Sequence, residues 1–222
     1  MATIPAASGT LHRDSSIQNL TYLALGDSYT IGHDVPATDN YPSQTATLLK
    51  QENIDSKVQI IATTGWTTAD LKNAIHTTET SGHLLTFYNI VTLLIGVNNE
   101  YQGIPISVYK TEFEELLKKA IALAGGQAKH VIVISIPDWS VTPFAGNRDQ
   151  PKISKEIDDY NAINKDFSGR YGTAYLDITP WTREAGADLS LLADDKLHPS
   201  GKEYARWATS LDAMIKKILT TQ

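Results

Sequence analysis

Short apolar blocks, separated by polar stretches, recur along the chain and have the length and composition of β-strands. They are rich in Val, Ile and Leu, and most of them end at or near a glycine or a proline. The block at 89–95 is almost continuously apolar, which is typical of a strand covered on both faces. The sequence therefore predicts strands over residues 19–25, 57–62, 89–95, 130–136 and 174–178.

Each predicted strand is followed by a segment whose apolar residues recur at the spacing of an amphipathic helix. Thr68 is the expected cap of the second helix, and Gly125 and Gly126 are expected to end the third. Pro199 is expected near the first turn of the last helix. The predicted helices cover residues 41–54, 68–76, 107–123, 154–170 and 199–219.

The alternation of strands and helices predicts a parallel sheet with right-handed crossovers and helices on both faces. We expect one α/β domain over residues 19–222, a three-layer α/β/α fold of the flavodoxin-like type. Its five-stranded parallel sheet has the predicted order 2-1-3-4-5. Residues 1–18 are expected to form a flexible N-terminal segment. The connection at 138–153 is unusually long, so we expect it to be a binding-site loop.

Composition excludes several classes of function. The chain of 222 residues has no cysteine, so it has no disulfide, no thiolate zinc site and no cysteine nucleophile. Its formal net charge is -6, and we therefore expect no nucleic-acid partner. No apolar run is long enough to span a bilayer, so stable membrane insertion is not expected. The oligomeric state cannot be read from the chain.

Residues 1–18 have neither a basic start nor a continuous apolar core, so the chain as written carries no signal peptide. A cytoplasmic location is expected of such a chain. A periplasmic or secreted location is expected instead if a leader has been removed. The sequence leaves the compartment open.

Polar residues that suit acyl transfer follow the ends of the predicted strands. In an open parallel sheet the carboxyl ends of the strands share one edge, where ligands bind. We therefore expect these residues to lie close together. They are Gly26, Asp27 and Ser28 after the first strand, Gly65 and Trp66 after the second, Gly96 to Asn99 after the third, Asp138 and Trp139 after the fourth, and Asp195 to Pro199 beyond the fifth.

Together these residues supply the parts of a serine hydrolase. Ser28 is a poor nucleophile until a base removes its proton, and His198 can be that base. Asp195, three residues earlier, can orient the imidazole. The oxyanion formed by attack on an ester needs donors, which the backbone N–H groups of Ser28 and Gly65 and the Asn98 amide can provide. Each residue alone is ordinary turn chemistry, but their combination favours a catalytic site.

The chain resembles the SGNH, or GDSL, hydrolase family in four blocks that run from the first strand to the last helix. The blocks are YLALGDSYTIG at 22–32, Gly65, GVNN at 96–99 and DKLHPSG at 195–201. The lysophospholipase-L1-like esterase branch is the most similar. The resemblance implies a flavodoxin-like fold, carboxylic ester hydrolysis and no metal or organic cofactor. It also implies Ser28, Asp195 and His198 as the catalytic triad, with Gly65 and Asn98 as oxyanion donors.

Two positions depart from the family pattern, and both bear on the pocket. Tyr29 stands where the family has Leu, and Asn99 stands where Asp often follows the oxyanion Asn. Aromatic residues near the strand ends can wall an acyl or an alcohol site. The predicted pocket residues are Trp66, Asn99, Trp139 and Phe144.

Other interpretations share some of these residues. An acyltransferase, a carbohydrate O-acetylesterase or an inactive binding module would keep the same pocket, and Asp194 is an alternative orienting residue for His198. If the chain is a hydrolase, its expected substrate is a small-molecule acyl ester or a lysophospholipid. A metal site at Asp27, Asp138 and Asp177 is disfavoured, since Asp27 is expected to fix the turn around Ser28. The sequence contains no phosphate-loop, dinucleotide, zincin or G-x-S-x-G motif.

Overall fold

The computed structural model describes residues 19–220, and the N-terminal segment predicted at 1–18 lies outside this range. Its centre is a five-stranded sheet in which all strands are parallel and the order is β2-β1-β3-β4-β5. The predicted order is therefore confirmed. The strands are β1 (Leu20–Gly26), β2 (Ser56–Ala62), β3 (Ile90–Leu94), β4 (Val131–Ile134) and β5 (Ala174–Leu176).

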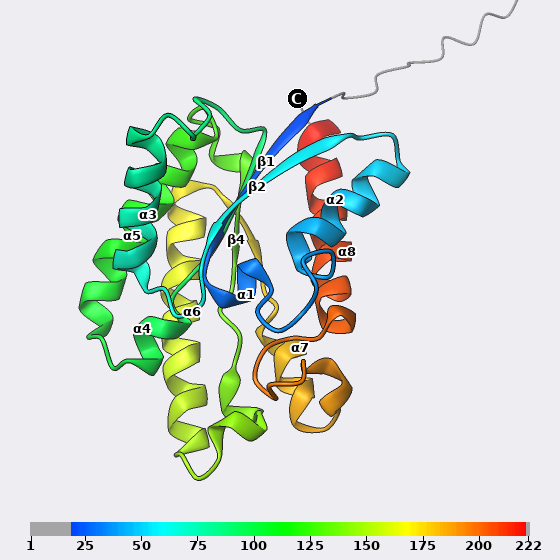
Figure 1. Ribbon diagram of the computed structural model, residues 1–222. Coiled ribbons are helices and arrows are strands. Elements are labelled where there is room, and N and C mark those ends of the chain that lie inside the picture. The colour runs from blue at the N-terminus through cyan, green and yellow to red at the C-terminus, as the bar shows by residue number, and fades with distance from the viewer. Residues whose placement is uncertain (1–18, 221–222) are drawn as a thin grey trace, which may run out of the picture.

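Helices cover both faces of the sheet and complete a three-layer fold (Figure 1). On one face α3 packs against α5 and α5 against α6, while α2 and α8 pack together on the other. Shorter helices lie at the edge where the strands end. The α-helices are α1 (Ser28–Ile31), α2 (Tyr41–Gln51), α3 (Thr68–Thr80), α4 (Val97–Tyr101), α5 (Ile106–Leu123), α6 (Gln150–Tyr171), α7 (Thr179–Arg183) and α8 (Gly201–Thr220). Single 3₁₀ turns are η1 (Ala128–His130), η2 (Trp139–Val141), η3 (Pro143–Ala145), η4 (Glu184–Gly186) and η5 (Leu189–Leu191).

The core lies between the sheet and its two helical layers. Every residue of β3 and β4 is buried, which explains why both strands are apolar except for Thr92 of β3. The apolar stripe of α5, which includes Phe113, Leu116 and Leu117, is buried against the sheet layer. Among residues 19–220, none of the helices combines the length and the apolar character that a membrane span needs.

Several element boundaries differ from prediction, and capping explains two of them. The cap of α3 is Thr67 rather than Thr68, because Thr67 and Asp70 form a reciprocal capping box. Helix α6 begins four positions earlier than predicted, with the Asp149 side chain accepting a hydrogen bond from Lys152 N at 3.1 Å and a proline in its first turn. The long connection before it contains η2 and η3.

Candidate active site

Ser28 begins a short helix directly after the first strand. The strand ends at Gly26, where a Cβ atom would lie 2.5 Å from the Leu94 carbonyl oxygen, so close packing requires glycine. Asp27 caps α1, and its Oδ1 accepts a hydrogen bond from Tyr29 N at 3.0 Å. The predicted role of Asp27 in fixing this turn is confirmed. Ser28 is thereby held at the carboxyl end of β1, which lies next to the central strand β3.

Asp27 is fully buried behind Ser28. Burial raises its pKa to about 7, against the opposing effect of the hydrogen bond from Tyr29 N. Within residues 19–220 its second oxygen, Oδ2, has no hydrogen-bond partner. A carboxyl group that changes charge near neutral pH therefore lies next to Ser28 in the chain.

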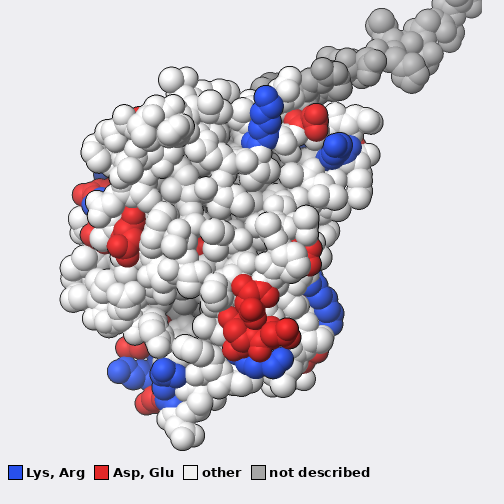
Figure 2. Space-filling model, in the orientation of Figure 1, with Lys and Arg blue, Asp and Glu red and all other residues white. Residues whose placement is uncertain are grey.

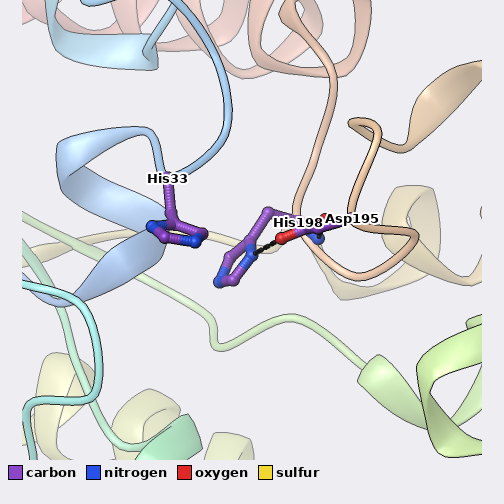
Figure 3. Close-up of side chains that lie close together, drawn as sticks. All are labelled: His33, Asp195 and His198. Atoms are coloured by element: carbon purple, nitrogen blue, oxygen red, sulfur yellow. Dashed lines mark hydrogen bonds and ion pairs between the residues drawn. The ribbon is translucent and has the colours of Figure 1, made fainter.

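A tight loop holds Asp195 against His198 (Figure 3). Asp195 Oδ1 accepts hydrogen bonds from the backbone N–H groups of Leu197 and His198, both at 3.0 Å. Asp195 Oδ2 lies 2.5 Å from His198 Nδ1. The carboxylate thus fixes both the loop and the imidazole ring, and its position favours a proton on Nδ1.

The pKa values of this pair suit a carboxylate beside a neutral base. Burial works to raise the pKa of Asp195, but its hydrogen bonds to His198 and Leu197 outweigh burial and hold the pKa below its usual value. Burial lowers the pKa of His198 below its ordinary value, although Asp195 works in the opposite direction. At neutral pH His198 is therefore free to accept a proton at Nε2.

Two neighbouring aspartates have different positions. Asp194 is exposed, and in the described part of the chain it forms no hydrogen bond with His198. Asp34 Oδ2 accepts a hydrogen bond from Asp195 N at 2.7 Å and ties the His198 loop to the loop after α1. No sequence signal points to Asp34, because the contact joins positions 161 residues apart.

Two rings pack against His198. The Tyr29 ring centroid lies 4.9 Å from that of His198, and the His33 centroid lies 4.7 Å from it. His33 Nδ1 is in turn 3.0 Å from Thr64 Oγ1. The tyrosine that replaces the family's leucine is therefore a packing partner of His198.

The described residues contain one group of side chains that could hold a metal ion, formed by His33, Asp195 and His198 within 4.8 Å of one another. Two of these side chains, Asp195 and His198, are hydrogen-bonded to each other through Nδ1 of the imidazole. Two of the aspartates that the sequence suggested for a metal site have other partners. Asp138 forms an ion pair with Arg183 at 2.8 Å, and Asp177 accepts a hydrogen bond from Ser135 Oγ.

Gly65 comes from the loop after β2, and Asn98 from helix α4, which follows β3. Gly65 has a φ of +85°, and a Cβ there would meet nothing within 4 Å, so backbone conformation rather than packing within the protein requires glycine. Asn98 Nδ2 donates to the Trp66 carbonyl oxygen at 3.0 Å, which orients the amide and leaves its second N–H free. The backbone N–H groups of Ser28 and Gly65 donate to no group among residues 19–220.

Two predicted pocket residues lie elsewhere. Asn99 is fully buried, with Oδ1 accepting from Thr68 N at 3.0 Å and Nδ2 donating to Thr68 Oγ1 at 2.7 Å. The Trp66 side chain packs against the core, and only its carbonyl group contacts Asn98. Neither side chain is among those that line the pocket beside Ser28, so their role in binding substrate stays a prediction.

The predicted nucleophile, base and oxyanion donors line a single pocket of about 140 Å³. Trp139 and Phe144 lie in its wall, and Tyr101, which the sequence did not indicate, packs on both with ring centroids 5.4 and 6.0 Å away. The lining residues are Ser28, Tyr29, Thr64, Gly65, Val97, Asn98, Tyr101, Trp139, Phe144, Leu197 and His198.

Comparison with known proteins assigns the chain to a family. A model of the GDSL-like lipase/acylhydrolase family matches residues 24–206. No match was found among curated proteins.

Solved structures share the fold at low sequence identity. The psychrotrophic esterase EstA from Pseudoalteromonas sp. is 19% identical, with a TM-score of 0.65 over 90% of this chain and 98% of that chain. The acetylxylan esterase Axe2 from Geobacillus stearothermophilus is 20% identical, with a TM-score of 0.65 over 90% and 96%. The lipase/acylhydrolase from Enterococcus faecalis is 17% identical, with a TM-score of 0.69 over 89% and 96%. The chain therefore belongs to the GDSL-like lipase/acylhydrolase family, and it is a serine ester hydrolase of that family.

Proposed function

We propose that Ser28 is the nucleophile, His198 the general base and Asp195 the residue that orients it. The observation that carries this proposal is the convergence of Ser28, Gly65, Asn98 and His198 on one small pocket. His198 is bonded there to an ionised carboxylate. A binding module has no use for a neutral imidazole held in this way beside a serine.

In the proposed reaction, Ser28 Oγ attacks the ester carbonyl carbon while its proton passes to His198 Nε2. The negative oxygen of the tetrahedral intermediate accepts hydrogen bonds from the Ser28 and Gly65 N–H groups and from Asn98 Nδ2. The carbon–oxygen bond to the alcohol then breaks, and His198 returns the proton to the leaving oxygen. Water attacks the acyl-enzyme by the same route and releases the acid.

The size of the pocket favours short acyl groups. The pocket has a volume of about 140 Å³, well below the roughly 300–1,000 Å³ of sites that hold drug-sized ligands. Phe144 and Leu197 border this space. A lauroyl chain would extend beyond it and gain few contacts, so short acyl esters are the proposed substrates rather than lysophospholipids.

This preference is tested with p-nitrophenyl esters from acetate to laurate. We expect kcat/KM for the butyrate to exceed that for the laurate by at least about tenfold, which corresponds to about 1.4 kcal/mol. The Ser28→Ala protein supplies the background rate for every ester. Higher kcat/KM for laurate would contradict a short acyl site, and turnover that survives Ser28→Ala would contradict the assignment of the nucleophile.

Products formed with a competing alcohol present distinguish a hydrolase from an acyltransferase.

The pH dependence of kcat/KM follows from His198. Below its pKa the imidazole is protonated and cannot accept the Ser28 proton, so activity falls as pH falls. Because burial lowers this pKa, we expect half of the maximal kcat/KM at a pH below about 6.5 and a plateau near neutral pH. The measurement is a pH–rate profile with p-nitrophenyl acetate.

Asp27 also titrates close to this range, with a pKa of about 7, so the Asp27→Asn protein serves as the control. The amide keeps the oxygen that accepts from Tyr29 N. The fall in kcat/KM at low pH should remain in this variant. If it disappears, the fall is caused by protonation of Asp27 and not of His198.

A further inference from the structure

A second, larger hollow opens beside the pocket that contains Ser28. This cleft lies between α4, the loop that follows it and the first turns of α6, and its volume is about 800 Å³. Tyr101 and Trp139 line both hollows. The cleft therefore begins one side chain away from the reactive pocket. An ester held at Ser28 has two halves, and the small pocket has room for only one of them.

We propose that this cleft binds the alcohol half of the ester, and that the alcohol is an uncharged polyhydroxy compound such as a sugar. The inference rests on the proposed function, because it requires Ser28 to be the reacting group. It follows from the hydrogen-bonding groups of the cleft wall and from the charges that the wall carries.

Four carboxyl groups line the cleft, and two of them, Glu100 from α4 and Glu156 from α6, interact with each other. Glu100 Oε2 accepts a hydrogen bond from Trp139 Nε1 at 2.8 Å, which fixes its position. Burial raises the pKa of Glu100 to about 7, and the neighbouring Glu156 carboxylate adds to this rise. Near neutral pH the two side chains therefore provide carboxylate oxygens that accept hydrogen bonds and, when Glu100 is protonated, a hydroxyl group that donates one. Hydroxyl groups, which both donate and accept, match this combination.

Arg148 covers the aromatic wall at the junction of the two hollows. Its guanidinium carbon lies 5.7, 5.5 and 5.2 Å from the ring centroids of Tyr101, Trp139 and Phe144. One guanidinium nitrogen donates to the Phe144 carbonyl oxygen at 2.8 Å. Arg148 occupies the faces of these rings, so a quaternary ammonium group would have to displace the guanidinium group to bind there. This disfavours a choline-like alcohol.

The remaining charges disfavour an anionic alcohol. Charged side chains of both signs gather at the lower left of Figure 2, where Figure 1 places α4 and the first turns of α6. Carboxylates outnumber cations in the lining, so a phosphate or sulfate would meet net repulsion. A long apolar alcohol would contact Ile104, Ile106 and Ile153, but it would also remove the charged side chains of the lining from water, which costs free energy. The charged lining residues are Glu100, Asp149, Glu156 and Asp159 against Arg148 and Lys152.

The experiment compares two esters that share an acetyl group, glucose 6-acetate and p-nitrophenyl acetate. In the Glu156→Leu protein we expect kcat/KM for glucose 6-acetate to fall at least about tenfold, because a hydroxyl loses a hydrogen bond to a charged group. The alcohol half of p-nitrophenyl acetate has no hydroxyl group to lose a hydrogen bond, so its kcat/KM should fall clearly less than that of glucose 6-acetate. Asp166→Leu replaces an exposed carboxylate of α6 that pairs with Arg170, and it should leave both values unchanged.

The inference is overturned if Glu156→Leu leaves glucose 6-acetate hydrolysis intact, or if it lowers both substrates equally. It is also overturned if the wild-type protein hydrolyses acetylcholine with a higher kcat/KM than glucose 6-acetate. Hydrolysis of p-nitrophenyl acetate that disappears in Ser28→Ala supports the proposed function in any of these cases. If neither ester is hydrolysed, the proposed function fails. Calorimetry then tests the cleft independently of turnover. Glucose 6-acetate should bind to the Ser28→Ala protein, and this binding should be lost when Glu156→Leu is added.

Discussion

Replacing Asp195 by asparagine should lower kcat by about 10⁴-fold, the loss typical of removing the carboxylate that orients a catalytic histidine. The geometry explains why the amide cannot substitute. One oxygen of Asp195 accepts two backbone N–H groups, from Leu197 and His198, and the other faces His198 Nδ1. The amide must turn its oxygen toward the two backbone donors, which leaves its NH₂ group facing Nδ1. The proton of the imidazole then moves to Nε2, where it blocks acceptance of the Ser28 proton.

Asp194→Asn is the matched control, because Asp194 is the adjacent exposed carboxylate. Its kcat should stay close to that of the wild-type protein. Thermal unfolding of both variants shows whether the loop is intact, since the two backbone hydrogen bonds are expected to survive in Asp195→Asn. A large loss of kcat in Asp194→Asn with little loss in Asp195→Asn would move the orienting role by one residue.

Replacing Asn98 by alanine should lower kcat by about 10²–10³-fold, the usual cost of removing one side-chain donor from an oxyanion site. One N–H of this amide is held by the Trp66 carbonyl oxygen. The other is available to the negative oxygen that forms in the transition state. Because that oxygen is a stronger acceptor than the ground-state carbonyl, the loss should appear in kcat more than in KM. Steady-state kinetics with p-nitrophenyl acetate measures both.

The Asn98→Ala protein also loses a tie between two loops, and Gln102→Ala controls for this. Gln102 Nε2 donates to the Gly65 carbonyl oxygen at 3.4 Å and so joins the same two loops. It does not line the reactive pocket. A kcat that is unchanged in Asn98→Ala, or equally reduced in Gln102→Ala, would contradict the oxyanion role.

The fold could be predicted because the strongest sequence signals report burial. The almost continuously apolar runs of β3 and β4 are interior strands of the sheet, and the stripe of α5 is the buried face of a long helix. The short helices α1 and α4 were not predicted, since four or five residues are too few to show a helical period. The boundaries of α3 and α6 depend on side-chain caps, which local pattern identifies only to within a few residues.

The site could be predicted in part because parallel strands end at one edge of the sheet. That rule is enough to bring Ser28, Gly65, Asn98 and His198 to one pocket. It does not give the direction of each side chain, so Asn99, adjacent to Asn98, was expected in the pocket and is instead buried against Thr68. Contacts such as Asp34 with Asp195 arise only when distant loops meet, and no local pattern indicates them.

The central claim is that Ser28 becomes covalently modified during turnover. A p-nitrophenyl phosphonate ester reacts with an activated serine and leaves a stable adduct, which peptide mass spectrometry locates. The account predicts one adduct per chain, on the peptide that contains Ser28, with loss of esterase activity in proportion to labelling and no adduct in Ser28→Ala. An adduct on a different serine, or full loss of activity without modification of Ser28, would contradict it.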